Sequence, residues 1–131
     1  MTKFVIYSYA LDRMERVIIS DKVFKMPKNL EPADYFKDCF GIINNKDSEV
    51  QKVVLKVDAF PSNYIRNQPL HDSQKETKRT DEYSIFEYHL KPEFDFEQEI
   101  FSNMDTMEVL EPLWLREEVK ERIKNLASKY L

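Results

Sequence analysis

Three polar residues in the stretch QPLHDSQKE, residues 68–76, are well placed to bind a ligand. His71, Ser73 and Gln74 all form hydrogen bonds, and Lys75 adds a positive charge beside them. On one strand they would form a polar edge able to receive a phosphate or a base. Alternatively, His71 bonds a nearby backbone carbonyl, while Ser73 and Gln74 only end the strand. The sequence alone permits both interpretations.

Basic and aromatic neighbours would enlarge such an edge. Lys78 and Arg79 follow in the chain, and Tyr64 or Tyr83 would supply a surface on which a base stacks. Proteins that bind single strands combine these two features, a basic groove and aromatic platforms. The competing interpretation is that the aromatic side chains belong to the core.

Two arginines near the start of the chain form a second candidate site. Arg13 ends the short sequence LDR and follows Asp12, so the two could be a solvated ion pair of small energetic value. The planar guanidinium group of Arg13 also suits phosphate recognition. Arg16 is the weaker candidate, because on a strand it would share a face with Met14 and Ile18.

No catalytic, metal or cofactor site is predicted. Cys39 is the only cysteine, and we interpret it as a small buried hydrophobe because neither histidine is near it in sequence. A phosphate loop after the first strand of the second half would need glycines, but that position reads DAFPSN. Asp81 and Glu82 lie in a turn without an acid–base partner, so the chain is predicted not to be an enzyme.

Composition favours a soluble cytoplasmic protein. The 131 residues carry a net charge of −4, and no run approaches the roughly 18 apolar residues that span a membrane. We expect no secretion signal and no contact with a membrane. Charge is uneven: residues 1–66 have 11 basic and 9 acidic residues (+2), and residues 67–131 have 9 and 15 (−6). This balance argues against direct binding of duplex DNA.

The first part of the chain is predicted to be a hairpin and a short helix. Residues 4–9 and 14–20 are rich in β-branched and aromatic residues and are separated by ALDR, which indicates two strands. A helix is expected over 30–41, with Pro32 in its first turn and Gly41, the only glycine, as a left-handed C-cap. The polar linker at 44–49 then marks a boundary.

The second part has a recognisable order of elements. Strands are predicted over residues 50–58, 69–76, 83–91 and 107–111, helices over 59–68 and from about Asp95, and a terminal helix from Pro112. This order is the split βαβ pattern of a ferredoxin-like α+β fold, with one sheet face left for a partner. Asp95 and Gln98 have the spacing of a capping box. In the terminal helix an apolar stripe is expected opposite a solvated charged face; the face comprises Glu117, Glu118, Lys120, Glu121 and Arg122.

Four stretches together resemble one known family. They are IYSYALDRMERV, YFKDCFGI, VVLKVDAFPSNYIRNQPLHDSQ and MEVLEPLWLREEVKERI. In this order they look like the C-terminal portion of bacterial WYL-domain transcriptional regulators. The resemblance runs nearly end to end and depends on LDR, FG after a helix, PLH.SQ and VLEP..LR.

The resemblance implies an architecture. Residues 1–45 would be part of an Sm-like or SH3-like β-barrel, and residues 46–131 the ferredoxin-like extension called WCX. The helix-turn-helix domain and the Trp-Tyr-Leu strand of the family are absent from this sequence. Arg13 matches the arginine that lines the barrel's basic pocket in the family, and His71, Ser73 and Gln74 match PLH.SQ.

The resemblance also implies a function. The chain would be a non-catalytic module that senses an effector and forms a homodimer, with single-stranded nucleic acid or a nucleotide as the effector. Duplex DNA would be bound only through the missing helix-turn-helix domain. The alternative is a stand-alone interaction protein that pairs with a full-length regulator through exposed strands.

Overall fold

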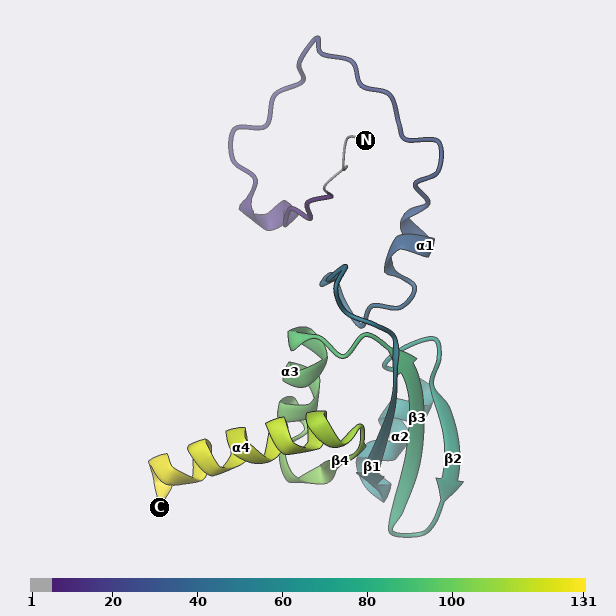
Figure 1. Ribbon diagram of the computed structural model, residues 1–131, viewed down its shortest axis with the longest axis vertical. Helices are drawn as coiled ribbons and strands as arrows, with labels where there is room; N and C mark the ends of the chain where they lie inside the picture. The colour runs from purple at the N-terminus through teal and green to yellow at the C-terminus, as the bar shows by residue number, and fades with distance from the viewer. Residues whose placement is uncertain (1–5) are drawn as a thin grey trace.

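A computed structural model describes residues 6–131, apart from the side chain of Met104, and shows a mixed α+β fold (Figure 1). Its regular elements in chain order are the 3-10 helix η1 (Leu11–Arg13), α1 (Pro32–Phe36), β1 (Gln51–Asp58), α2 (Ala59–Asn67), β2 (Lys75–Arg79), β3 (Tyr83–Leu90), α3 (Phe94–Ser102), the 3-10 helix η2 (Met104–Thr106), β4 (Met107–Glu111) and α4 (Leu113–Tyr130). The predicted ferredoxin-like βαββαβ order with a terminal helix is confirmed.

The four strands form one antiparallel sheet in the order β2-β3-β1-β4. The two central strands pair along their whole length, with Val53 opposite Tyr88 and Leu55 opposite Phe86. Alternate residues of a strand point to opposite faces, so these four side chains share one face. They are all fully buried there, which confirms the alternating pattern seen in the sequence.

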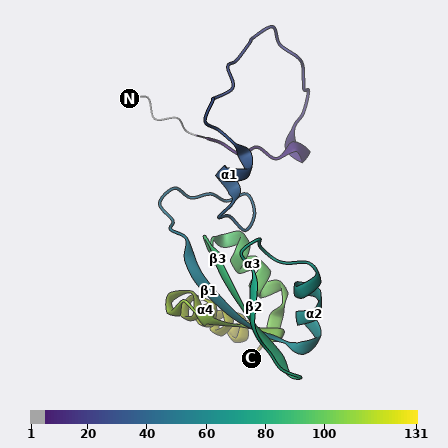
Figure 2. The ribbon, with the colours of Figure 1, turned by 90° about the vertical axis from the view of Figure 1, so that its right-hand side faces the viewer.

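The core lies between this inner face and the helices. Ile65 of α2, Phe96 and Ile100 of α3 and Leu115 of α4 pack against the inner side chains of the sheet. Figure 2 shows α2 and α3 together on one side of the sheet. Burial of apolar area on this scale is the main stabilising contribution to such a domain. None of the described helices is long and apolar enough to span a membrane.

The second strand begins later than predicted. The sequence indicated a strand over 69–76, whereas β2 covers Lys75–Arg79, and the predicted turn at 77–82 shortens to the residues between β2 and β3. The reason is local: the backbone N–H of Gln74 donates to the carbonyl of His71, which folds this segment into a turn. Polar side chains that bond their own backbone compete with strand pairing in this way.

Two predicted helix caps are wrong. Among the described residues no glycine has a positive φ, so Gly41 is not a left-handed cap, and α1 ends at Phe36. Gly41 instead faces Asp95, because a Cβ atom placed on it would lie 2.5 Å from the Asp95 Oδ2 atom. Glu93, not Asp95, is the N-cap of α3, and it makes no side-chain cap hydrogen bond. Asp95 is therefore inside the first turn, and the expected capping box does not form.

The first 30 residues differ most from expectation. Residues 4 and 5 lie outside the described part of the chain, and residues 6–30 contain no strand, so the predicted hairpin over 4–9 and 14–20 does not form there. Its β-branched side chains in the second range are exposed, among them Val17, Ile18 and Ile19. A two-stranded hairpin is marginal in water without a surface to pack on, and this segment packs on none within the described chain.

We predict that Gly41→Ala destabilises the domain by about 1–3 kcal/mol, because the new methyl group overlaps the Oδ2 atom of Asp95, which is buried. Urea unfolding followed by Trp114 fluorescence measures the change in the free energy of unfolding. The control is Gly41→Ala in an Asp95→Ala background, where the overlapping carboxylate is gone and the cost should shrink below 1 kcal/mol. Equal costs in both backgrounds would contradict this explanation.

Candidate functional site

The predicted polar residues meet in the turn that precedes β2. Both the backbone N–H and the hydroxyl of Ser73 lie within hydrogen-bonding distance of His71 Nδ1, at 3.1 and 2.8 Å. His71 Nε2 lies 2.9 Å from the carbonyl oxygen of Lys37. A carbonyl only accepts, so the ring carries its proton on Nε2 and accepts at Nδ1. The imidazole therefore joins this turn to the segment that follows α1.

Both the oxygen and the nitrogen of the Gln74 side-chain amide form hydrogen bonds within the protein. Its Oε1 atom accepts from the N–H of Leu70 at 3.1 Å and from the Tyr88 hydroxyl at 2.8 Å. Its Nε2 atom donates to the carbonyl of Ile65 at 2.9 Å, at the end of α2. Burial, reinforced by the Glu99 carboxylate, raises the pKa of Tyr88, which keeps the phenol protonated as a donor.

Ser73 links the same turn to the sheet. Its hydroxyl accepts from the backbone N–H of His89, near the end of β3, at 2.9 Å. Because β2 begins only at Lys75, the N–H of His89 has no backbone partner on that strand, and the Ser73 hydroxyl accepts its hydrogen bond instead. The structure thus brings His71, Ser73 and Gln74 together, and each makes hydrogen bonds within the protein. His71 bonds a backbone carbonyl, as the structural interpretation expected, whereas Ser73 and Gln74 precede β2 and do not end a strand. A ligand-binding role for them stays a prediction.

We predict that Gln74→Ala lowers the free energy of unfolding by about 1–3 kcal/mol, because it leaves the Tyr88 hydroxyl and the Ile65 carbonyl without their partners. Chemical denaturation measures this change. Lys75→Ala is the matched control, because its side chain is exposed in the next position and makes no hydrogen bond among the described residues. A Gln74→Ala variant as stable as wild type would show that water replaces these bonds at no cost.

The other predicted residues do not join this cluster. Lys75 opens β2 and is exposed beside the turn. Arg13 ends η1 and Arg16 has a positive φ of 52°, and both are exposed in the segment 6–30. Figure 1 shows this segment as a loop beyond α1, away from the sheet. Arg13 and Arg16 thus lie apart from His71 in this structure, and their role in ligand binding stays a prediction.

The outer face of the sheet gathers charged groups around one tyrosine. The Lys56 ammonium lies 4.7 Å from the centre of the Tyr83 ring, and Lys78 donates to the Tyr83 hydroxyl at 2.9 Å. Lys52 pairs with Glu87 at 3.8 Å and with Glu111 at 3.5 Å. Sequence reasoning named Tyr83 and Lys78 but missed Lys56. The sequence signal that could have identified Lys56 is the alternation of β1: the buried valines point to the core, so the side chain of Lys56 points to the outer face.

A bidentate ion pair fixes β2 to α2. Arg66 donates from Nη2 to Glu76 Oε1 at 2.7 Å and from Nε to Oε2 at 2.9 Å, and the Ser84 hydroxyl also donates to Oε1 at 2.7 Å. These hydrogen bonds, that of Arg66 above all, lower the pKa of Glu76 from 4.5 to about 2. The Arg66–Glu76 pair lies on the inner side of β2, a short edge strand that is mostly exposed and has few apolar contacts of its own.

Because the pKa of Glu76 is lower in the folded protein, its stabilising contribution is complete above about pH 4.5 and is lost as the pH falls toward 2. We predict that Glu76→Gln is less stable than wild type at pH 7 and that the difference disappears on acidification through this window. Urea unfolding at a series of pH values tests this. Glu82→Gln, whose side chain makes no ion pair among the described residues, should show no such trend. A difference that is constant with pH would argue against the ion pair.

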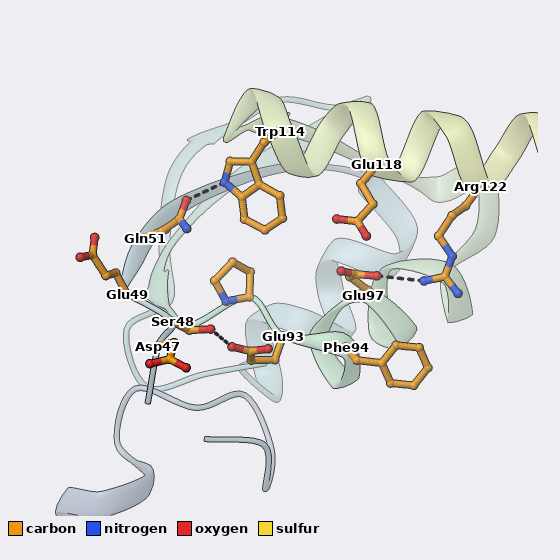
Figure 3. Close-up of a pocket in the computed structure, with 11 residues that line it drawn as sticks. Asp47, Ser48, Glu49, Gln51, Glu93, Phe94, Glu97, Trp114, Glu118 and Arg122 are labelled. Carbon is orange, nitrogen blue, oxygen red and sulfur yellow. Dashed lines mark hydrogen bonds and ion pairs between the residues drawn. The ribbon is translucent and has the colours of Figure 1, made fainter. Parts of the chain in front are cut away.

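An acidic groove separates α3 from α4 and the segment before β1 (Figure 3). Its volume is about 720 Å³, and it is lined by Asp47, Ser48, Glu49, Gln51, Pro92, Glu93, Phe94, Glu97, Trp114, Glu118 and Arg122. Trp114 donates from Nε1 to Gln51 Oε1 at 2.7 Å, which holds the indole at one wall. Arg122 bonds Glu97 at 2.9 Å at the other end. Of the helix face expected to be solvated, Glu118 and Arg122 thus belong to this groove.

Burial dominates the electrostatics of the groove. The side chain of Glu97 is only 10% exposed, and its pKa is raised by burial and by the nearby Glu118 carboxylate, against the opposing effect of Arg122. Figure 3 shows the carboxylates of Glu97 and Glu118 facing each other beneath α4. Sequence reasoning missed this site because nothing in the sequence pairs residues 93–97 with residues 114–122.

Other chemistry finds little support in the described residues. They contain no group of three or more His, Cys, Asp or Glu side chains that could hold a metal ion. Cys39 is buried, and burial raises the pKa of its thiol, as is typical of a packed cysteine.

Comparison with known proteins gives one family. Residues 49–127 match the model of the WCX domain, which covers the whole sheet, α2, α3 and most of α4. The match spans more than half of the 131 residues. No curated protein matches the chain.

Proposed function

Because the chain belongs to the WCX domain family, the C-terminal part of WYL-type regulators, we propose that it is a non-catalytic module that senses an effector and forms a homodimer. Membership of the family supports a regulatory role in general terms. The effector class, the binding surface and the dimer contact are inferred from the physical features of the chain.

The observation that carries the sensing role is the open outer face of the sheet. Lys56 and Lys78 flank the ring of Tyr83 there, and Lys75 lies on the same strand as Lys78. Ammonium groups neutralise phosphates, and the half-buried phenol ring of Tyr83 offers a surface on which a base can stack. This combination suits a nucleotide or a short single-stranded nucleic acid. Arg13 and Arg16 lie in the segment 6–30, away from this face, and are separate candidates for phosphate binding.

The dimer contact is assigned to the second half of α4. Ile123, Leu126 and Tyr130 are exposed at helical spacing, and Figure 1 shows this end of the helix projecting away from the sheet. Residues 113–121 carry two basic and three acidic groups (−1), whereas residues 122–131 carry three basic groups and no acidic group (+3). If two copies of α4 pack antiparallel along their whole length, the second half of each helix lies beside the first half of the other, so that opposite charges are side by side.

In this proposal the effector acts by shifting the population of dimer arrangements. A ligand changes such an equilibrium only to the extent that it binds one arrangement more tightly. Arrangement of the dimer would in turn set the spacing of DNA-binding domains connected to it. The chain contributes the sensing surface and the helix through which two copies meet.

We predict that a fluorescein-labelled oligothymidine of ten nucleotides binds the chain with an affinity that falls with salt. Replacing two lysines, Lys56→Gln with Lys78→Gln, should weaken binding at least tenfold. It should also reduce the slope of log affinity against log salt by about 1.4, or about 0.7 for each phosphate contact. Fluorescence anisotropy at several salt concentrations measures both quantities.

The matched control for this experiment is Lys120→Gln with Lys124→Gln, which removes two positive charges from α4 and should leave oligonucleotide binding within twofold of wild type. Equal weakening by both double variants would show that net charge, and not the sheet face, drives binding. Arg13→Ala and His71→Ala, measured in the same way, test the residues that the sequence motifs indicated.

A second candidate function rests on the exposed apolar residues of the segment 6–30. Ile18, Ile19 and Phe24 have no packing partner among the described residues, so a partner protein could bury them by strand pairing. The chain would then be an interaction protein for a full-length regulator. Dimerisation without any oligonucleotide binding would favour this function over effector sensing.

A further inference from the structure

The acidic groove has a large excess of negative charge. Asp47, Glu49, Glu93, Glu97 and Glu118 contribute five carboxylates, and Arg122 alone opposes them, which leaves −4. Trp114 supplies an apolar surface among these charges, and Phe94 lies at the outer end of the groove near Arg122 (Figure 3). A concave surface that combines carboxylates with aromatic rings favours an extended basic segment whose other side chains are apolar.

Arg122 shows which kind of side chain the groove binds, namely a cation beside aromatic rings and a carboxylate. Its guanidinium group lies 4.7 Å from the ring centre of Phe101 and 5.9 Å from that of Phe94 while it bonds Glu97 Oε2. The second oxygen of this nine-tenths buried carboxylate makes no hydrogen bond with any described residue. Glu118 likewise has no cation partner in the part of the chain that the structure describes. The groove therefore holds one cation and retains acceptors for more.

A segment of the chain itself has the complementary properties. Residues 22–28, KVFKMPK, contain three lysines and no acidic residue. Their apolar side chains are almost fully open to water: Val23 is 97% exposed, Phe24 82% and Met26 68%. None of the three lysines forms an ion pair among the described residues. We refer to residues 22–28 as the arm.

The arm does not reach the groove of its own chain in this structure. Figures 1 and 2 both place the segment 6–30 on the far side of α1 from the sheet and its helices. One wall of the groove is α4, the helix assigned above to the dimer contact. A second copy bound along α4 would therefore lie beside this groove.

We propose that the arm of one copy docks in the acidic groove of a second copy, and that in a two-fold dimer the exchange is mutual. This inference rests on the homodimer proposed above and names a contact that stabilises it. Lys22, Lys25 and Lys28 bind the carboxylates, and Phe24 and Met26 cover the indole of Trp114. The attraction between lysines and carboxylates makes the contact weaken as salt rises.

A charge-swap experiment on the full chain tests the exchange. The arm variant carries Lys22→Glu, Lys25→Glu and Lys28→Glu, and the groove variant carries Asp47→Lys, Glu49→Lys and Glu118→Lys, which change the charge of the groove from −4 to +2. Each variant alone brings like charges together, so its dimer should dissociate at a concentration at least tenfold higher than that of wild type. An equimolar mixture pairs opposite charges in both contacts and should recover wild-type association within twofold. Sedimentation equilibrium gives these constants.

Trp114, the only tryptophan of the chain, reports from within the groove. Its emission should shift to shorter wavelength when wild type or the mixture dimerises and should stay unshifted in each variant alone. The control is Asp81→Lys with Glu82→Lys, which changes charge in the turn between β2 and β3, away from the groove, and should dimerise like wild type. Circular dichroism verifies that every variant is folded.

The outcomes separate this inference from the proposed function. If both charge variants dimerise as wild type does, arm exchange is overturned while the homodimer stands. If wild type stays monomeric at all concentrations, both are overturned. If the Trp114 shift occurs in dilute monomer and disappears in the arm variant, the arm occupies its own chain's groove, which overturns exchange between copies.

Discussion

The pairing of β1 with β3 is the contact on which the rest of the domain depends. Eight residues of each strand pair in register, and their inner side chains, such as Leu55 and Phe86, are completely buried. A shift of one residue would turn these side chains toward water and the lysines toward the core. The same register therefore fixes two things at once: the apolar surface that holds the helices, and the outer face on which Lys56 meets Tyr83.

The polar turn before β2 is held by the hydrogen bonds of its own motif residues, so these residues have a structural role. His71, Ser73 and Gln74 connect the end of α2, the segment after α1 and the last residues of β3. Gln74 also satisfies the hydroxyl of Tyr88, a large polar group inside the core. Removing these side chains would leave buried groups without partners, so the motif holds together the edge of the sheet at which β2 begins.

Helix α4 connects the features to which function is assigned. Leu115 anchors its first turn in the core, Arg116 bonds Glu108 and the carbonyl of Val109 on the edge strand, and Arg122 reaches Glu97 on α3. Beyond Arg122 the helix leaves the domain with its apolar side chains exposed. It thus forms a wall of the acidic groove and also offers the surface through which two copies could meet.

The order of strands and helices in residues 50–130 follows from the sequence alone, because strand alternation and helical spacing are local patterns that each element carries by itself. The strand positions of Val53, Leu55 and Val57 and the start of α4 could be predicted in this way. The late start of β2, the contact of Gly41 with Asp95 and the acidic groove could not. The contact and the groove depend on side chains that are distant in sequence, and only packing of the whole chain brings them together. The late start of β2 comes from the local turn between His71 and Gln74, which the sequence pattern did not distinguish from a strand. In the exposed segment 6–30 the residues favour strands, but no strand forms, because a strand needs a partner and the described chain provides none.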